Sequence, residues 1–598
     1  MSMKQFLKMT MATILGALVV FVLSIIILTS VVGSMLTIGT ETPSMPKDGI
    51  LTIDMSSFML AEQDKKPELT TLLQGNEPIP SIGIWNAVQS IKTAAQDPSI
   101  RYIFIRPDNP ITGLAQIEEF RNALEIFRKS GKPVIAYLEN PSNGSYYLAS
   151  VADKIYMTSH QGGLITMNGL ATQLVFLKDA LDKLGVNVQL IRHGKYKSAG
   201  EMYIKSASSP ENREQNQEMI DAIWEAWTAK ICASRDIAPE KFNGLIDELE
   251  LNSPEDFLEN KLVDELMSHD ELKNKLADLA QKDSYRKVGR INFTDYVTLH
   301  SMPNFKASNK IAIIYADGSI VDGDQSQEVA GARFANIITK VRLDDNVKAV
   351  VLRVNSPGGS VFASEQIKSE LDLLRETKPV IASYGNYAAS GGYWISSNCD
   401  YIFSDEGTLT GSIGVFSMIP DISGTLKKIA HVNVETISSN KHGDLYGMTR
   451  ALTPKECEYL QEGVEDIYNK FTSIVSKGRN MTVSQVDDIA QGRVWAGTDA
   501  KNIGLVDQLG GLDDAVAYAI AAAGEYSSDL SEWQIENFPK PISMSQELML
   551  MLSGAPTQDP DGIFAGTFLS PVATAYADWS AKQSGKMYAA MPYIYDIK

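Results

Sequence analysis

A serine and a lysine that lie far apart in this 598-residue sequence have the residue types needed for nucleophilic chemistry. Ser390 stands in the turn AASGGYW, and Lys197 stands in the stretch HGKYKSAG. A serine hydroxyl needs a base that removes its proton as it attacks a carbonyl carbon. Lysine can be that base only when neutral, and at its ordinary pKa near 10.4 only about 0.04% is neutral at pH 7. Burial can lower the pKa far enough, so the sequence predicts a desolvated Lys197.

Three glycine-rich turns in the second half of the chain each follow an apolar run typical of a buried strand. They are RVNSPGGSV (353–361), NYAASGGYW (386–394) and TLTGSIGVF (408–416). Glycines after parallel strands let the backbone turn sharply and leave N–H groups free to face a ligand. One such turn is usually only a turn. Three at successive strand ends indicate a binding site, because α/β sheets bind ligands there.

An internal repeat with a spacing of about 246–248 residues indicates duplication of one domain. The stretch that ends at Arg106 aligns with the stretch that ends at Arg353. The block GKPVIAYLEN aligns with TKPVIASYGN, and YYLASVADKIY aligns with YWISSNCDYIF. In both copies, short Val- and Ile-rich runs alternate with amphipathic stretches. This alternation is typical of βαβ units around a mostly parallel sheet, so we expect an α/β fold with two tandem duplicated domains.

The two copies have kept different polar residues. Ser390 aligns with Asn143 or Gly144 of the first copy, while Ser142 and Ser145 are out of register. Conversely, the position near Asp444 in the second copy aligns with Lys197. The first copy also lacks the PGG turn. Because one half retains a lysine and the other a serine, we expect one shared site between the halves.

The domain boundaries follow from this repeat. We expect an N-terminal α/β domain over 45–300, which supplies the lysine, and a C-terminal α/β domain over 311–540, which supplies the serine. The polar stretch 301–310 is interpreted as a linker. Residues 541–598 contain Pro and Gly at irregular intervals and are expected to form a peripheral tail.

The N-terminus predicts a single-pass membrane anchor. Residues 11–33 are uncharged and almost wholly apolar, and about 20 such residues span a bilayer. Lys4 and Lys8 precede this run, so residues 1–10 are expected in the cytoplasm and the rest of the chain across the membrane. A long, cleaved signal peptide is the alternative interpretation and gives the same location for the mature chain.

Composition excludes several classes of protein. The net charge of −19, with no basic run, argues against nucleic-acid binding. The three cysteines form no CxxC pair, and the six histidines form no HExxH helix. We therefore expect no metal and no cofactor.

Four ordered motifs, RVNSPGGS, AASGGYW, GSIGVF and HGKYKSA, resemble the long, two-domain form of the bacterial signal peptide peptidase A family. The resemblance runs from the anchor to about residue 525. It implies a serine protease in which Ser390 is the nucleophile and Lys197 is the base, with Ser412 orienting the lysine amine. It also implies a fold like that of the crotonase and Clp-protease superfamily. The backbone N–H groups of Gly358 and Gly391 are the expected oxyanion donors, and Gly359 is an alternative to Gly358.

The same resemblance implies partners and location. Members of the family assemble as a dome-shaped homotetramer with a hydrophobic groove and degrade signal peptides left in the membrane. We therefore expect an enzyme of the bacterial inner membrane whose catalytic part lies on the periplasmic side, with peptide substrates that carry small or apolar side chains.

The sequence leaves alternatives open for the identity of the base and for the class of protein. Lys195, or one of His193, His431 and His442, could be the base in place of Lys197. A crotonase-type acyl-CoA enzyme would use similar glycine turns, but the expected external location argues against it, because CoA is cytoplasmic. An inactive membrane scaffold is the third class, and the presence of both Ser390 and Lys197 argues against it.

Overall fold

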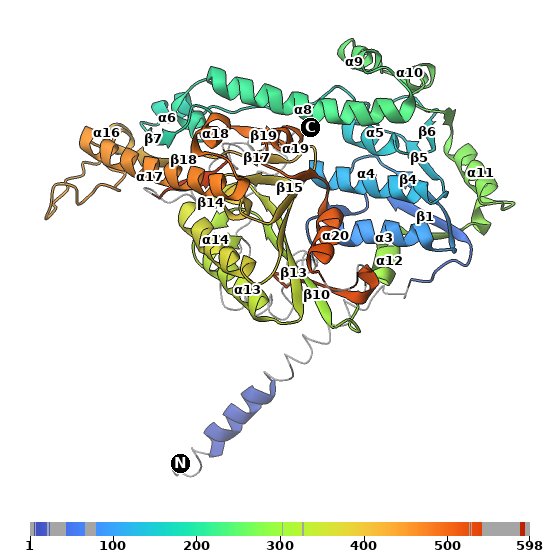
Figure 1. Cartoon of the computed structure of the whole chain (residues 1–598), viewed down its shortest axis with the longest axis horizontal. Coiled ribbons are helices and arrows are strands. Elements are labelled where there is room, and N and C mark those ends of the chain that lie inside the picture. The colour runs from blue at the N-terminus through green and yellow to red at the C-terminus, as the bar shows by residue number, and fades with distance from the viewer. Residues whose placement is uncertain are drawn as a thin grey trace.

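The computed structural model describes residues 5, 8–20, 23, 43–65, 79–301, 303–325, 328–524, 527, 529–540 and 586–591. Two α/β units lie next to each other, one built from the first half of the chain and one from the second (Figure 1). A third sheet, which contains strands from both halves, joins them.

The sheet of the first unit has six strands, all parallel, in the order β8-β6-β5-β4-β1-β9. Its central strands are short runs of Ile, Val and Tyr that are buried on both faces, as parallel strands covered by helices require. The strands are β1 (Gly49–Asp54), β4 (Ile100–Arg106), β5 (Val134–Leu138), β6 (Lys154–Thr158), β8 (Glu265–Met267) and β9 (Gly289–Asn292). A separate pair is formed by β2 (Met59–Ala61) and β3 (Ser81–Gly83).

The second sheet repeats this arrangement. Its parallel strands follow one another in the order β20-β16-β15-β13-β10-β21, which matches the first sheet strand for strand. The far end of β15 also pairs with β17, which is antiparallel to β19. The bounds are β10 (Asn309–Asp317), β13 (Val347–Ser356), β15 (Val380–Ala389), β16 (Tyr401–Ser404), β17 (Leu409–Gly411), β19 (Val494–Ala496), β20 (Gln508–Leu509) and β21 (Trp533–Phe538). The prediction of an α/β fold with two parallel-sheet domains is confirmed.

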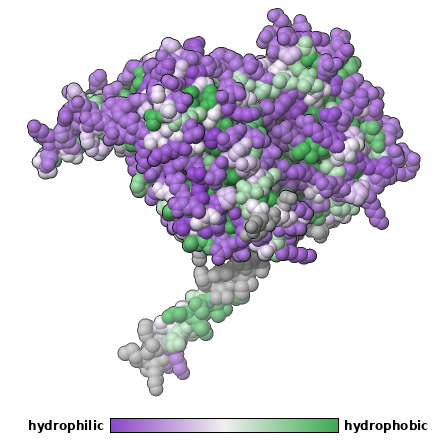
Figure 2. Space-filling model, viewed as in Figure 1, coloured by the Kyte–Doolittle hydropathy of each residue, from purple (hydrophilic) through white to green (hydrophobic). Residues whose placement is uncertain are grey.

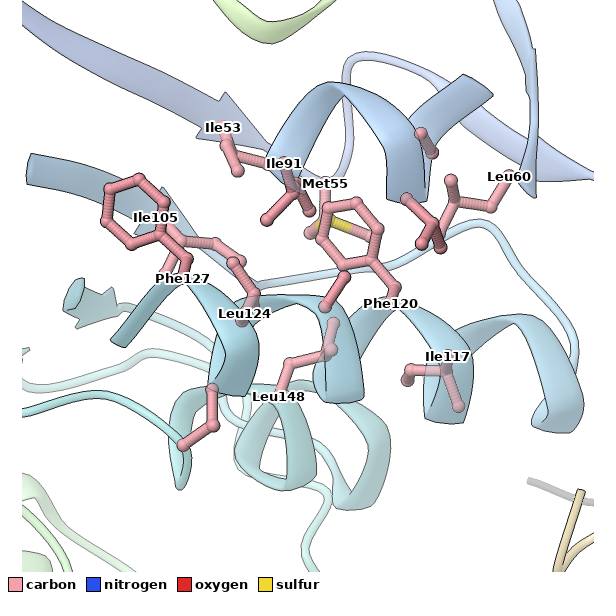
Figure 3. Close-up of a cluster of buried hydrophobic side chains, with 14 of the residues drawn as sticks. Ile53, Met55, Leu60, Ile91, Ile105, Ile117, Phe120, Leu124, Phe127 and Leu148 are labelled. Carbon is pink, nitrogen blue, oxygen red and sulfur yellow. The ribbon is translucent and has the colours of Figure 1, made fainter. Parts of the chain in front are cut away.

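Amphipathic helices cover these sheets and form the cores. In the first unit α3 and α4 pack side by side, and their apolar faces meet strand residues such as Ile53 and Ile105 (Figure 3). Phe120 of α4 lies at the centre of this cluster and packs edge-to-face on Phe293. Burying one such side chain contributes about 1.5–3 kcal/mol. The helices of the first unit are α3 (Ile84–Gln96), α4 (Leu114–Lys129), α5 (Asn143–Ala149), α6 (Lys178–Lys183), α7 (Glu201–Ile204), α8 (Pro210–Arg235), α9 (Pro239–Asp247), α10 (Pro254–Glu259), α11 (His269–Leu279) and α12 (Phe293–His300).

The helices of the second unit enclose a core of their own, in which Trp394 packs on Phe471 at a ring distance of 4.7 Å. These helices are α13 (Gly331–Leu343), α14 (Val361–Arg375), α15 (Gly391–Ser396), α16 (Ser423–Lys428), α17 (Pro454–Arg479), α18 (Val483–Ile489), α19 (Gly497–Asn502) and α20 (Leu512–Ala522). Short 3-10 turns lie at Tyr285–Lys287 and Leu530–Glu532.

The third sheet has the order β12-β11-β14-β22-β18-β7 and joins the two halves. Its strand β7 belongs to the first half of the chain and runs antiparallel to β18 of the second half over seven residue pairs. After β7 the long helix α8 crosses the molecule from one unit to the other (Figure 1). The bounds are β7 (Asn187–His193), β11 (Ile320–Val321), β12 (Val329–Ala330), β14 (Gly358–Ser360), β18 (Val415–Asp421) and β22 (Tyr588–Ala590).

Buried charges also hold the two units together. The guanidinium of Arg353, at the end of β13, is inaccessible to solvent and lies 2.6 Å from Glu62 Oε2 and 2.6 Å from Glu119 Oε1. Both glutamates belong to the first unit. Burial raises the pKa of Glu62, although the Arg353 charge acts in the opposite direction.

Three sequence predictions need correction or lie partly outside the described residues. Residues 586–591 of the expected peripheral tail instead form β22 and its flanks, inside the third sheet. The predicted linker 301–310 is shorter than expected, because β10 already begins at Asn309. Of the predicted anchor 11–33, the described residues 11–20 and 23 are helical. Across the described ranges no helix combines the length and the apolar character needed to cross a bilayer.

Candidate active site

Ser390 occupies a strained turn between a strand and a helix. It follows β15 directly and precedes α15, with φ 55° and ψ −111°. A positive φ is unusual for a residue with a Cβ and persists only where the surrounding structure enforces it. Here the Ser390 N–H donates to the Gly411 carbonyl at 2.8 Å, and the Ser390 carbonyl accepts from Trp394 N–H at 2.8 Å. These bonds hold the hydroxyl at the end of the second sheet.

Lys197 reaches this hydroxyl from the first half of the chain. Its Nζ lies 2.9 Å from Ser390 Oγ and 3.0 Å from both the carbonyl oxygen and the Oγ of Ser412. All three side chains are inaccessible to solvent. A neutral amine has two N–H donors and one lone pair. The geometry therefore suits an amine that donates to both Ser412 oxygens and accepts the proton of Ser390.

Two glycines of the second half make room for the lysine. A methyl group built on Gly492 would come within 2.5 Å of Lys197 Cβ, and one on Gly414 within 3.0 Å of Lys197 Cδ. Gly492 also has φ 81°, which disfavours residues with a side chain. Neither glycine was singled out from the sequence. The only signal there is that Gly414 belongs to the GSIGVF motif.

The segment that carries Lys197 is fixed by buried polar contacts. Arg192 donates to the Lys197 carbonyl at 2.5 Å and lies 3.2 Å from the Glu201 carboxylate. Burial alone would raise the pKa of Glu201, but hydrogen bonds from Ser209 and the Arg192 charge lower it overall. Gln215 of α8 donates to Ser198 Oγ at 2.9 Å. Because these groups are bonded to one another, the backbone at Lys197 is held in one position.

The expected oxyanion residues lie together beside Ser390. A methyl group built on Gly358 would lie 2.6 Å from the Gly391 nitrogen, so the two turns are in close contact. The Gly358 N–H, however, donates to Ser356 Oγ at 3.2 Å. Gly359 lies between Ile320 of β11 and Ala589 of β22 in the third sheet, so contacts of this kind do not decide between Gly358 and Gly359 as the donor.

The other candidate bases lie elsewhere. Lys195 is exposed and rests over the Tyr196 ring. His193 contacts Glu465 Oε2 at 2.6 Å and His442 contacts Glu456 Oε1 at 2.8 Å, so both histidines have carboxylate partners that the sequence did not reveal. His431 lies in the exposed segment after α16. The nitrogen at hydrogen-bond distance from Ser390 Oγ is that of Lys197.

The corresponding turn of the first unit caps the helix α5. Tyr146 of α5 and Tyr393 of α15 each donate to a backbone carbonyl in their own unit, and matching these two residues places Asn143 at the position of Ser390, with Ser142 one residue before it. The Ser142 hydroxyl accepts from the Ser145 N–H in a capping box. Asn143 bonds the backbone of Gly169 in both directions, at 2.9 and 3.2 Å.

An α/β fold with a buried serine hydroxyl facing an amine, beside glycine-rich turns, has the features of a serine hydrolase. The chain matches Peptidase family S49 over residues 126–283 and 372–524. It belongs to this family and is a serine peptidase. Lys197 lies in the first matched segment, while Ser390 and Ser412 lie in the second.

Similar proteins are found in bacteria and a plant. "Protease 4" of Haemophilus influenzae is 36% identical, over 80% of this chain and 80% of that protein. "Protease 4" of Salmonella typhi is also 36% identical, over 85% and 83%. "Serine protease SPPA, chloroplastic" of Arabidopsis thaliana is 32% identical, over 71% and 64%. The family assignment favours the peptidase over the acyl-CoA enzyme and the inactive scaffold.

Proposed function

We propose that the chain is an endopeptidase that uses Ser390 as nucleophile and Lys197 as general base. The observation that carries this proposal is the 2.9 Å separation between Lys197 Nζ and Ser390 Oγ inside a buried site. Neutral Lys197 takes the hydroxyl proton as Ser390 attacks the peptide carbonyl. The protonated amine then passes that proton to the leaving nitrogen, which gives an acyl-enzyme that water hydrolyses.

The oxyanion of this reaction would be stabilised by backbone donors. Gly391, directly after the nucleophile, is one proposed donor, and Gly359 or Gly358 is the other. Loss of a single donor of this kind can reduce the rate by about 10²–10³. Ser412 would orient the lysine amine, since both of its oxygens lie 3.0 Å from Lys197 Nζ.

The substrates proposed are apolar peptides, including remnants of signal peptides in the membrane. The sequence motifs that resemble those of the signal peptide peptidase A family support this class. So does the apolar cluster beside the third sheet, which contains Val188, Ala199, Tyr203, Phe416 and Met418. The duplicated domains, proposed over 45–300 and 311–540, would have the fold of the crotonase and Clp superfamily.

We also place the enzyme at the inner membrane of a bacterium, with its catalytic part on the periplasmic side. The helical residues 8–20 carry exposed apolar side chains, among them Ile14, Leu15 and Leu18 (Figure 2). Exposed side chains of this kind suit contact with lipid rather than with water.

The proposed homotetramer has support in one exposed segment, the arm formed by residues 429–448. Its stretch VNVET (432–436) follows VNVQL (186–190) by one repeat length of 246 residues. Residues 187–190 belong to β7, whereas 432–436 form no strand within the described residues. Ile437 there is 94% exposed. In the first half, residues 168–174 have the repeat position of β18 and also lack a strand. If the arm of one copy paired with residues 168–174 of the next copy, both segments would gain a neighbouring strand. Repetition of this contact would close a head-to-tail ring of copies.

The test is hydrolysis of an apolar fluorogenic peptide by the purified full chain. We expect Ser390→Ala and Lys197→Met to lose at least about 10³-fold in kcat/KM. Lys195→Met is the matched control, because Lys195 is exposed and two positions away, and it should retain activity. Folding of each variant is checked by circular dichroism. A Lys197→Met enzyme with wild-type activity would refute the assignment of the base.

A further inference from the structure

The short segment that joins α18 to β19 contacts both the loop of the proposed base and the loop of Ser412. The Gln491 carbonyl accepts from the Tyr196 N–H at 2.9 Å, and Tyr196 directly precedes Lys197. The Arg493 carbonyl accepts from the Ser412 N–H at 2.7 Å. The segment therefore connects the residue before the base to the residue that would orient it.

The strand that follows this segment leads to the nucleophile. Val494 of β19 lies opposite Gly411 of β17 in an antiparallel pair. The Gly411 carbonyl accepts from the Ser390 N–H at 2.8 Å. The segment and its strand thus contact the backbone supports of Lys197, Ser412 and Ser390.

The Arg493 side chain attaches the segment to the loop of the base. Its Cζ lies over the Tyr196 ring at 4.7 Å and over the Trp495 ring at 4.2 Å. Its Nη1 also donates to Tyr196 Oη at 3.3 Å. The Arg493 side chain is 15% exposed, and a guanidinium binds an aromatic face most strongly where water is excluded. These contacts hold the Tyr196 ring in place.

Helix α8 adds two carboxylates to the same contact. Glu218 pairs with Arg493 Nη2, and Glu214 Oε1 lies 3.7 Å from Arg493 Nη1. Glu214 also accepts from the Tyr196 hydroxyl at 3.1 Å. Both carboxylates are about half exposed, so water screens these pairs. The ring contacts of Arg493 should therefore fix Tyr196 more firmly than the ion pairs do.

The position of Tyr196 matters because Lys197 is the next residue in the chain. The reaction requires Lys197 Nζ to stay at hydrogen-bond distance from Ser390 Oγ, which is 2.9 Å in the structure. A misplacement of about 1 Å between reacting groups can reduce a rate by about 10²-fold. A residue that fixes Tyr196 would therefore influence the rate without touching the reacting atoms.

We propose that Arg493 is a positioning residue, which acts through Tyr196 to hold the Lys197 amine against the Ser390 hydroxyl. This inference rests on the proposed Ser–Lys mechanism. The proton transfers remain those of Lys197 and Ser390, and Arg493 contributes by holding the loop of the base. Its loss should reduce kcat more than it changes KM, because the distance between base and nucleophile affects the chemical step and not the binding of the peptide.

The experiment measures kcat and KM of the purified full chain for an apolar fluorogenic peptide, together with the rate of labelling by a serine-reactive phosphonate ester. Arg493→Met should reduce kcat and the labelling rate at least about tenfold and change KM by less than about twofold. Arg493→Lys keeps the charge but lacks the planar group, so its kcat should lie between those of Arg493→Met and the wild type. Lys195→Met removes the exposed amine over the same ring and should keep the wild-type kcat.

A double-mutant cycle tests whether Arg493 acts through Tyr196. Tyr196→Leu removes both the ring and the hydroxyl that Arg493 contacts. Addition of Arg493→Met to Tyr196→Leu should reduce kcat by less than about twofold further, because the contact is already lost. Losses that multiply in the double variant would overturn the inference.

Arg121→Met is the control for a general loss of stability. Arg121 is also a buried arginine over a tyrosine ring, at 5.0 Å from Tyr147, and it lies in the first unit on α4. This variant should lower the melting temperature and keep its kcat. An equal loss of kcat in Arg121→Met and Arg493→Met would overturn the inference.

The remaining outcomes separate the inference from the proposed function. A wild-type kcat in Arg493→Met, or a loss confined to KM, overturns the role of Arg493 and leaves the Ser–Lys mechanism intact. A wild-type kcat in Lys197→Met contradicts the mechanism itself. Where Arg493→Met does not fold, Arg493→Lys takes its place in both measurements, and a wild-type kcat in that variant would equally overturn the inference.

Discussion

The surroundings of the Lys197 amine determine its chemistry. The three oxygens at 2.9–3.0 Å from Nζ belong to serine residues and carry no charge, and the side chain is inaccessible to solvent. Burial disfavours the protonated form of an amine. The proposed base is therefore a buried amine within hydrogen-bond distance of serine oxygens.

Gly492 provides the first test at the scale of single residues. Gly492→Ala should reduce kcat at least about tenfold, because the added methyl group would lie 2.5 Å from Lys197 Cβ and the residue has φ 81°. The measurement is peptide hydrolysis, with the melting temperature recorded alongside. Gly244→Ala is the matched control, since no atom lies within 4 Å of the added methyl group. Full activity of Gly492→Ala would mean that the position of Lys197 is not restricted there.

At the scale of elements, local patterns predicted the sheets but not the contact between the halves. The repeat and the Val- and Ile-rich runs predicted two α/β units, because each parallel strand depends on its own apolar residues. The pairing of β7 with β18 joins residues more than 200 positions apart, and no local pattern encodes it. The same holds for β22, whose three residues are too short to show a period. The role of Gly492 could not be predicted from the sequence, because it depends on the contact with Lys197, which lies almost 300 positions earlier in the chain.

The buried ion cluster at the end of β13 gives a prediction about stability. Arg353→Met should destabilise the protein by about 3–5 kcal/mol, because Glu62 and Glu119 would remain buried without their partner. Thermal unfolding measures this loss. Arg375→Met is the comparison, since its pair with Asp400 is partly exposed and should contribute at most about 1 kcal/mol. Equal losses in the two variants would contradict a special role for the cluster.

Asp405, in the same region, predicts a dependence of stability on pH. Burial, together with the charges of Glu119 and Glu118, raises the pKa of Asp405 well above its usual value. Its unfolded-state pKa is near 3.9, so its favourable contribution is complete below that pH and is lost as pH rises toward the folded-state pKa. Asp405→Asn should therefore be more stable than the wild type at pH 8 by at least about 1 kcal/mol, and the difference should shrink near pH 4.

Melting temperatures recorded from pH 4 to pH 8 check this expectation. Asp283→Asn is a suitable control, because Asp283 is 86% exposed and should leave the pH profile unchanged. A wild type and an Asp405→Asn variant with parallel profiles would contradict the burial argument.

At the scale of the whole molecule, the two halves complete one another. The first half provides β7 and Lys197, and the second provides the strand and the turn that receive them. The equivalent arm of the second half, residues 429–448, extends away from the body of the molecule beside α16 (Figure 1). In the proposed ring, the arm of one copy would pair with residues 168–174 of the next copy. This is the same head-to-tail contact that β7 and β18 make between the two halves of one chain.

The arm predicts how assembly can be disrupted. Ile437→Asp should shift the purified protein from the proposed tetramer toward smaller species, because it places a charge in the contact between copies. Analytical ultracentrifugation measures the distribution. Leu343→Asp is the control, since Leu343 is 69% exposed at the end of α13 and lies outside the arm. An unchanged tetramer in the Ile437→Asp variant would exclude the arm from the interface.

The central claim is that Ser390 is activated by Lys197, and covalent labelling tests it most directly. The full chain is treated with a serine-reactive phosphonate ester, and the modified residue is located by peptide mass spectrometry. We expect one label on Ser390 in the wild type and in Lys195→Met, and labelling at least about 10²-fold slower in Lys197→Met. A label on another serine, or equally fast labelling of Ser390 without Lys197, would contradict the account.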